Sequence, residues 1–282
     1  MKRVRVWLAA LCCLLLVGCT TRLIYYWLDW VVAWQLDDYF SLSSSQSKAL
    51  DRELRGFMVW HRSSEIPRYA KELRQLGKAV ASPMSQDQVS QALSQLEEDI
   101  DRVIGNALPR AVRLAQLLND DQLSRFIRER REKLEDKQVA FRLKSRAAME
   151  REFADKMNER LVYWLGSVEP AQQPLVARWV SWQYELYGPW LDYQHQWWNE
   201  FASVVRLKGT PDFAVRLGAL LTSGDGLMGG RYTGYSQQSR ERTVQWLSDL
   251  SQSLTLAQRA HLYGLFKGFA DDFAVMARTS EH

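Results

Sequence analysis

The sequence predicts an all-α fold, a multi-helix bundle with long helices that follows an N-terminal signal peptide. Two observations lead to this prediction. Polar boxes of the form Ser/Thr/Asn-x-x-Gln recur before apolar runs, and such boxes mark helix starts. Apolar residues between the boxes recur at helical spacing, and no stretch shows the period-2 alternation of a strand. We therefore expect a single helical body over residues 19–282.

The segment 1–18 has the three parts of a bacterial lipoprotein signal peptide. The charged n-region contains Lys2, Arg3 and Arg5. An apolar h-region follows from Val6 to Val17, and Gly18 is the small residue before the cleavage site. The apolar run is shorter than the roughly 20 residues that a membrane-crossing helix needs. We expect cleavage after Gly18 and attachment of lipid to Cys19, so that the N-terminal lipid joins the protein to the membrane.

Charge and cysteine content exclude two classes of site. The formal net charge is +4, but removal of the three leader cations leaves 34 basic side chains (37 minus 3) against 33 acidic ones. An exported chain with so balanced a charge is not expected to bind nucleic acid. The three cysteines, Cys12, Cys13 and Cys19, lie in the leader or at the cleavage point. The body therefore has neither a disulfide nor a cysteine metal site.

The first expected helix, residues 22–40, is crowded with tryptophan and tyrosine. From Leu23 to Trp34 it carries one charged residue, Asp29, so it must be buried by protein or by lipid headgroups. About twelve residues rise only about 18 Å, which is too little to cross a bilayer. Two coverings remain open: burial within the bundle, and partial insertion at the membrane interface, which favours Trp and Tyr.

Five boxes divide the rest of the chain into helices. They are Ser43 with Gln46, Ser85 with Gln88, Asn119 with Gln122, Thr255 with Gln258 and, more weakly, Glu169 with Gln172. The expected helices are 22–40, 44–62, 66–81, 86–117, 120–165, 170–206, 211–222, 237–252 and 256–278. Proline is expected to restart a helix at Pro67, and to kink or break one at Pro109 and at Gly188-Pro189. The glycine-rich segment 222–235 is expected to be a flexible loop.

Histidines and carboxylates are the candidates for chemistry, and they form no recognisable catalytic or metal-binding set. His61 and Glu65 stand four residues apart, like two ligands on a metal-binding helix, but an HExxH motif and a nearby third ligand are missing from the sequence. His195 and Asp192 could orient an imidazole as a general base, but no nucleophile motif accompanies them. We expect no catalytic residue, no cofactor and no metal.

The predicted binding surface combines the N-terminal aromatic residues with the polar residues that follow them. Its members are Trp30, Trp34, Asp38, Trp60, His61, Arg62 and Glu65. Tryptophan suits such a surface because it offers a large apolar face with a polar tip. The other tryptophans are expected mainly to pack between helices.

Two resemblances add to this interpretation. The N-terminal part resembles a family of uncharacterised proteobacterial lipoproteins, catalogued as a domain of unknown function, through Cys19, Arg22 to Trp30, Trp34 to Tyr39, Leu42 to Gln46, Trp60-His61-Arg62 and Glu65 to Ala70. That likeness implies a periplasm-facing lipoprotein and no particular activity. The boxes Leu42 to Gln46 and Leu254 to Gln258 resemble, more weakly, the repeated motif of helical periplasmic chaperones of the Spy and CpxP type.

Together these features predict a lipid-anchored envelope lipoprotein that works by binding or scaffolding, in a chaperone-like or assembly accessory role. Thr20 stands where an aspartate would signal retention at the inner membrane, so we expect the outer membrane, with the body facing the periplasm. The expected partners are the membrane, through the lipid, and an envelope protein client. The alternative is an enzyme that acts on cell-wall or envelope lipid substrates.

Overall fold

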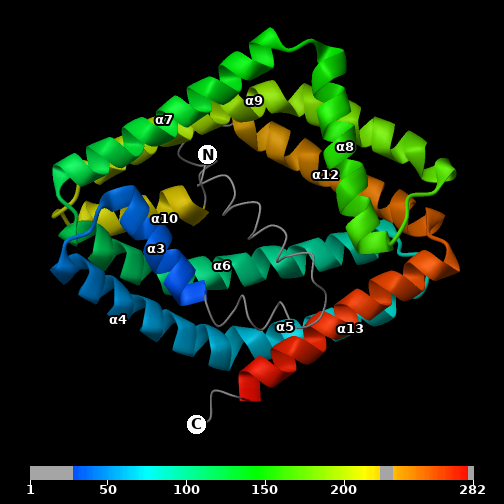
Figure 1. The fold of residues 1–282 in the computed structure, drawn as a ribbon, viewed down its shortest axis with the longest axis horizontal. Coiled ribbons are helices and arrows are strands. Elements are labelled where there is room, and N and C mark those ends of the chain that lie inside the picture. The colour runs from blue at the N-terminus through cyan, green and yellow to red at the C-terminus, as the bar shows by residue number, and fades with distance from the viewer. Residues whose placement is uncertain (1–27, 223–230, 279–282) are drawn as a thin grey trace. The chain divides into compact units, whose positions relative to one another are not determined.

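A computed structural model describes residues 28–222 and 231–278, and this part of the chain is helical with no strand. The all-α prediction is confirmed. The helices are α3 (Leu28–Phe40), α4 (Ser44–Trp60), α5 (Ile66–Ala79), α6 (Gln86–Leu117), α7 (Asp120–Leu143), α8 (Arg146–Leu165), α9 (Gln173–Val205), α10 (Asp212–Thr222), α12 (Arg231–Ser253) and α13 (Leu256–Arg278) (Figure 1). A π-helical turn, η1 (His61–Glu65), precedes α5, and a short 3-10 turn, η2 (Pro170–Gln172), precedes α9. None of the described helices combines the length and apolarity needed to cross a membrane.

Contacts group the described residues into two compact units. Unit 1 comprises 28–79 and 263–278, and unit 2 comprises 80–222 and 231–262. In unit 1, Met58, Ile66 and Met276 form the buried cluster. In unit 2, α9 packs against α7, α8, α10 and α12. The predicted signal peptide and Cys19 lie outside the described residues.

Capping boxes start the helices where the sequence predicts them. At α4, the Gln46 amide donates to Ser43 Oγ (3.3 Å) and the Ser43 amide donates to Gln46 Oε1 (2.8 Å). The same reciprocal pair forms at α6 and α7, with Ser85 and Asn119 as the caps. Each box satisfies two backbone amides that would otherwise lack a partner in the helix.

The prediction of one helix over residues 120–165 is wrong, because this stretch forms two helices, α7 and α8. Ser145 has an extended backbone (φ −64°, ψ 152°), and its Oγ accepts from the Ala148 amide at 3.3 Å. This is an N-cap. Ala148 stands where a capping box would have Gln or Glu, so the sequence pattern did not mark the break.

The prolines of the described helices do not end them. The chain stays helical from α4 through η1 into α5, and Pro67 lies in the first turn of α5, where a proline ring is tolerated. Pro109 and Pro189 lie inside α6 and α9, and neither helix breaks there. On α6, packing of Leu108 and Val112 against the cluster that contains α10 holds the turns on both sides of Pro109. Tertiary packing thus outweighs the local cost of the ring.

The predicted flexible loop over 222–235 overlaps two helices. Thr222 ends α10, and α12 already begins at Arg231, so Gly234 lies within a helix. Residues 223–230 lie outside the described part of the chain. Glycine lowers helix propensity by only about 1 kcal/mol, which the rest of a long helix can offset.

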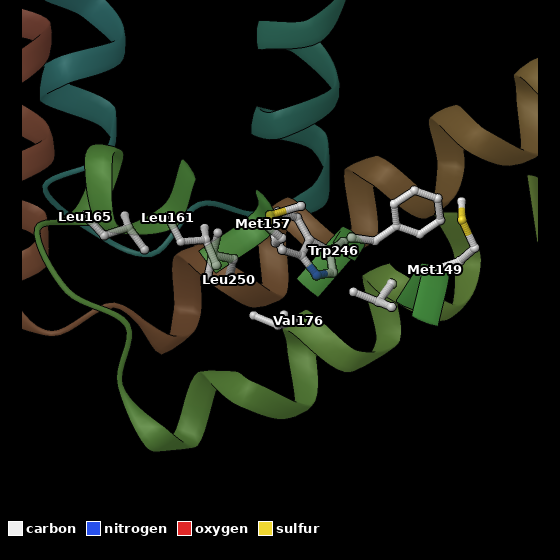
Figure 2. Packing of buried hydrophobic residues seen from close by; sticks show 9 residues of the cluster. Met149, Met157, Leu161, Leu165, Val176, Trp246 and Leu250 are labelled. Atoms are coloured by element: carbon white, nitrogen blue, oxygen red, sulfur yellow. The ribbon is translucent and has the colours of Figure 1, made fainter. Parts of the chain in front are cut away.

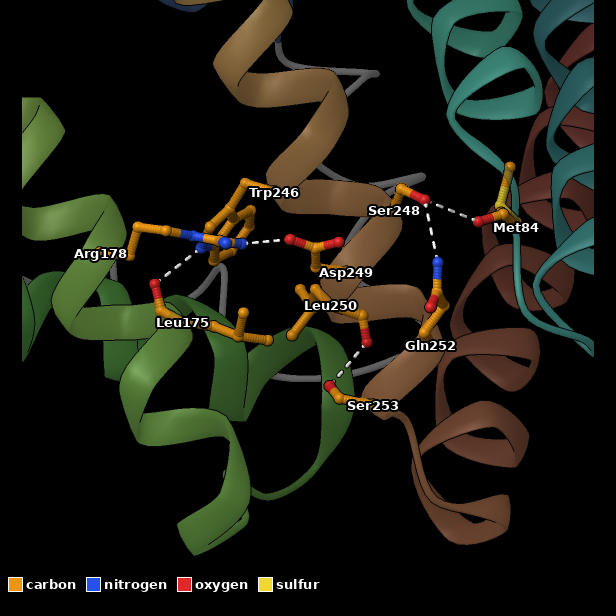
Figure 3. Close-up of polar contacts among 9 residues, drawn as sticks. All are labelled: Met84, Leu175, Arg178, Trp246, Ser248, Asp249, Leu250, Gln252 and Ser253. Atoms are coloured by element: carbon orange, nitrogen blue, oxygen red, sulfur yellow. Dashed lines mark hydrogen bonds and ion pairs between the residues drawn. The ribbon is translucent and has the colours of Figure 1, made fainter.

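The main core of unit 2 is a stripe on α8 (Figure 2). Its residues recur every four positions, as one face of a helix requires, and they are Met149, Phe153, Met157, Leu161 and Leu165. The stripe packs against Val176 and Val180 on α9 and against Trp246 and Leu250 on α12. The Trp246 indole N–H donates to the Leu175 carbonyl at 2.8 Å, so this buried ring leaves no orphaned donor (Figure 3).

Two glutamines from separate capping boxes form a buried pair in unit 2. Gln172 and Gln258 are 0% and 1% exposed. The Gln172 amide nitrogen donates to Gln258 Oε1 at 3.0 Å, and the Gln258 amide nitrogen donates to Gln172 Oε1 at 2.9 Å. Each Oε1 also accepts from the backbone amide of its own box, that of Glu169 or that of Thr255, at 3.0 Å. The pair therefore joins the start of α9 to the start of α13.

Within unit 2, serines on α12 hold the segment that precedes α6. The Met84 amide donates to Ser251 Oγ at 2.9 Å. Ser248 Oγ donates to the Met84 carbonyl at 3.0 Å, a contact that Figure 3 shows. The buried Arg259 guanidinium donates to the carbonyls of Val80 and Ser251. Ser251 lies in the last turn of α12, where a cation complements the helix dipole as well as the free carbonyls.

Candidate binding surface

Helix α3 has two different faces, and the predicted residues Trp30, Trp34 and Asp38 lie on the same one. They are spaced four residues apart, so they follow one side of the helix. Trp30 and Trp34 are 59% and 46% exposed, and Asp38 is exposed as well. On another side of the helix, Leu28 packs against the buried cluster of unit 1. Protein therefore covers one side of α3 and leaves its tryptophans at the surface.

The turn between α3 and α4 depends on Asp37 rather than on Asp38. Ser41 takes a left-handed backbone (φ 49°), and its amide donates to the Asp37 carbonyl at 2.7 Å. The Leu42 amide donates to Asp37 Oδ1 at 3.0 Å. Asp37 thus ends α3 in an αL motif, and the Asp38 carboxylate stays at the surface.

The other four predicted residues lie together at the junction of α4 and η1. Trp60 is the last residue of α4, and His61, Arg62 and Glu65 belong to the π turn. The Ile66 amide donates to the His61 carbonyl, a bond that spans five residues instead of four. Single π turns inside α-helices are rare and frequently occur at functional sites.

An aromatic cluster surrounds the His61 imidazole. Its ring stacks on Phe57 (centroids 5.6 Å apart, planes at 22°) and meets Tyr69 edge-on at 5.7 Å. Trp60 lies 6.1 Å away, and Phe273 of α13 contacts Tyr69. Burial among these rings lowers the pKa of His61 from its ordinary value of 6.5, while the nearby Glu65 charge acts in the opposite direction. Burial thus favours the neutral form of this imidazole.

Glu65 is a carboxylate held inside unit 1. It is 1% exposed, and Ser64 Oγ donates to its Oε1 at 3.0 Å. Arg68 Nε lies 3.8 Å from the other oxygen, Oε2. A buried charge needs such partners because transfer out of water is costly. Among the described residues, no group of three or more His, Cys, Asp or Glu could hold a metal ion.

His195, the second histidine considered for chemistry, does not pair with Asp192. His195 Nε2 lies 3.1 Å from Gln138 Oε1 on α7, and Asp192 is exposed. His261 Nε2 likewise lies 3.1 Å from the Tyr163 carbonyl. These two imidazoles bridge helices of unit 2, which is a structural role.

Sequence reasoning missed a set of cation–aromatic stacks in unit 2. The guanidinium carbons of Arg178 and Arg242 lie 5.2 Å and 5.4 Å from the centroid of the Trp182 ring. Asp249 pairs with Arg178, and Glu185 pairs with Arg242 at 3.0 Å. Arg178 and Trp182 are four residues apart, a spacing that could have revealed half of the stack. Arg242 comes from α12, and only the tertiary fold brings it there.

A family model matches residues 38–233, which is more than half of the chain. The chain belongs to a family of unknown function, DUF6279. The matched range contains Trp60 and the whole π turn, whereas Trp30 and Trp34 precede it. The predicted membership in a family of unknown function is thus confirmed. No curated protein and no solved structure matches the chain.

Proposed function

We propose that this protein is a lipid-anchored envelope lipoprotein that acts by binding or scaffolding, without catalysis. Support for the anchor comes from the leader over residues 1–18, with Cys19 as the lipidated residue and Thr20 favouring the outer membrane. The partner is an envelope protein client in the periplasm. The helical body of the protein carries the binding surface.

The observation that carries the binding role is the gathering of Trp60, His61, Arg62 and Glu65 at one π turn. An aromatic cluster and a buried carboxylate occupy a helix distortion that costs regular hydrogen bonding. Val59, beside them at the end of α4, is a strongly exposed apolar residue. Aromatic and arginine side chains near exposed apolar area are the usual composition of a protein-binding surface.

The test places a photo-crosslinker in cells at Val59, next to the π turn, and at Leu143, an exposed apolar residue at the end of α7. We expect one defined envelope protein to be captured from position 59 and not from 143. Arg62→Ala should reduce the capture, and Cys19→Ala should release the protein from membranes. Equal capture from both positions, or capture from 59 that Arg62→Ala leaves unchanged, would contradict the binding role.

An enzyme acting on cell-wall or envelope lipid substrates is the second candidate. One observation favours it: His61 has a lowered pKa and interacts with the Glu65 charge in the same π turn. A neutral imidazole near a carboxylate can act as a general base. The double variant His61→Gln/Glu65→Gln tests this candidate, with circular dichroism to check that the fold is intact. An unchanged cell-envelope phenotype would contradict the enzyme hypothesis.

A further inference from the structure

The exposed side of α3 carries Trp30, Val31 and Trp34, all of them large apolar residues at the surface. Its other side is half-buried and includes Leu28, Val32 and Leu36. Apolar residues lie on both sides of this helix, yet the described part of the chain covers only one of them. A second covering is therefore needed for the tryptophan side, since clustered exposed apolar area marks an interaction surface.

Polarity changes along this side of α3. Trp30, Trp34 and Asp38 follow one another at four-residue intervals, so the surface passes from tryptophan to an exposed carboxylate toward the end of the helix. Asp37, also exposed, is held by its hydrogen bond to the Leu42 amide. The tryptophan side is apolar at the beginning of α3 and acidic at its end. Such a surface matches an environment that changes from apolar to aqueous over the length of this helix. The apolar part of that environment has to cover the first two turns and leave the last one solvated.

Among possible coverings, the headgroup region of a bilayer has this chemistry. Tryptophan is enriched at that depth because its ring is apolar and its indole N–H can still reach water. A 13-residue helix is about 20 Å long, which is too short to cross the roughly 30 Å hydrocarbon core but suits a helix lying at the interface. The two carboxylates oppose deeper insertion, and anionic headgroups would repel them toward water.

We propose that the side of α3 formed by Trp30, Val31 and Trp34 sits in the membrane interface, as a second contact beside the lipid anchor. This inference rests on the proposed lipidation of Cys19. About nine residues separate Cys19 from Leu28, and they span at most about 30 Å, so an anchored α3 cannot move far from the bilayer surface. The lipid on Cys19 would hold the chain at the bilayer, and the tryptophan side of α3 would add buried apolar area to that attachment.

The experiment uses the full processed protein in vesicles of phosphatidylethanolamine and phosphatidylglycerol. All cysteines of the sequence lie at or before Cys19, so one introduced cysteine carries a polarity-sensitive fluorophore. Val31→Cys reports on α3, and Val59→Cys, at a valine on α4 that is also exposed, is the control. We expect a blue-shifted emission, quenched by nitroxide lipids, at position 31 and an aqueous emission at 59.

Tryptophan variants show whether the rings hold the helix there. Trp30→Ala/Trp34→Ala should return the emission at position 31 toward its aqueous value, whereas Trp164→Ala, which removes an exposed tryptophan of unit 2, should not. An aqueous emission at 31, or equal quenching at 31 and 59, overturns the proposal. A shift at 31 that occurs in cells but not in these vesicles also overturns it, because a protein then covers α3.

Failure of the anchor gives a different result from failure of the insertion. Mass spectrometry of the purified chain reports whether Cys19 carries lipid and whether the leader has been removed. An unmodified Cys19 contradicts the proposed lipoprotein, whatever the fluorophore shows. A lipidated Cys19 with an aqueous signal at position 31 contradicts only the interfacial role of α3.

Discussion

Gln172 and Gln258 each use both ends of a buried side-chain amide. The oxygens close the capping boxes, and the nitrogens donate to the opposite glutamine and to backbone carbonyls, including that of Ser167. An amide in this position cannot lose its partner without leaving a buried polar atom unpaired. This makes the pair a sensitive point for stability.

Gln258→Leu should lower the free energy of unfolding by about 1–3 kcal/mol, because Gln172 and the Thr255 amide lose their partner. Gln172→Leu should have a similar effect. The double variant should lose less unfolding free energy than the sum of the two single losses, because each single change already removes the hydrogen bonds between the two side chains. Urea unfolding of the four proteins measures the coupling, and strict additivity would show that the two amides act independently.

The His61 imidazole should make stability depend on pH. Burial lowers its pKa in the folded state below 6.5, so the unfolded chain takes up the proton first. The free energy of unfolding should therefore fall as the pH drops from about 6.5 to the lowered pKa, and this contribution should be constant above 6.5. His61→Gln should reduce the slope in that window, and His195→Gln should serve as the control. A slope that His61→Gln does not change would contradict the burial effect.

Helix ends in this fold depend on backbone positions as well as on caps. Gly166 ends α8 with φ 82°, and its amide donates to the Val162 carbonyl at 2.8 Å. The His261 ring packs directly over it, so that a Cβ at this position would lie 3.2 Å from Nδ1. Gly209, between α9 and α10, has a similar φ of 89° with open space around it.

Gly166→Ala should destabilise the protein more than Gly209→Ala. Both changes force a side chain into the left-handed region, at roughly 1–2 kcal/mol. Only Gly166→Ala also pushes the His261 ring away from its contact with the Tyr163 carbonyl. Thermal unfolding of both variants gives the difference. Equal losses would mean that the His261 ring moves aside without cost.

Local signals explain which elements could be predicted. A capping box lies within four residues, so Ser43, Ser85 and Asn119 could be recognised as helix starts from the sequence. The break at Ser145 was missed because its box is incomplete. The π turn was missed because Pro67 suggested that one helix ends at residue 62 and a new one begins at 66. Periodicity also does not distinguish a bond across five residues from one across four.

At the scale of the whole molecule, the stability of unit 2 depends on one stripe of α8 side chains. Met157→Ala should lower the free energy of unfolding by about 2–5 kcal/mol, because it opens a cavity among residues of α9 and α12. Val162→Ala removes an exposed side chain of the same helix and should change stability little. Calorimetry compares the two, and similar melting temperatures would contradict this account of the core.

The candidate surface could be predicted only in part, because some of its residues are far apart in the sequence. Trp60, His61, Arg62 and Glu65 are neighbours in sequence, so their grouping follows from any helical local structure. Phe273, which completes the aromatic cluster through Tyr69, comes from the last helix, and no local pattern reports it. The same holds for Arg242 over Trp182. Exposure of Trp30 and Trp34 depends on which side of α3 packs, and an evenly apolar helix does not reveal that.

The glutamine pair also bears on how fast the chain folds. A capping box normally forms early, because it needs only neighbouring residues, but 86 residues separate Gln172 from Gln258. Closing so long a loop lowers the entropy of the chain before the hydrogen bonds form and offset that cost. Non-local contacts of this kind slow folding. We therefore expect the beginnings of α9 and α13 to reach their final form together and late in folding, although each capping box spans only four consecutive residues.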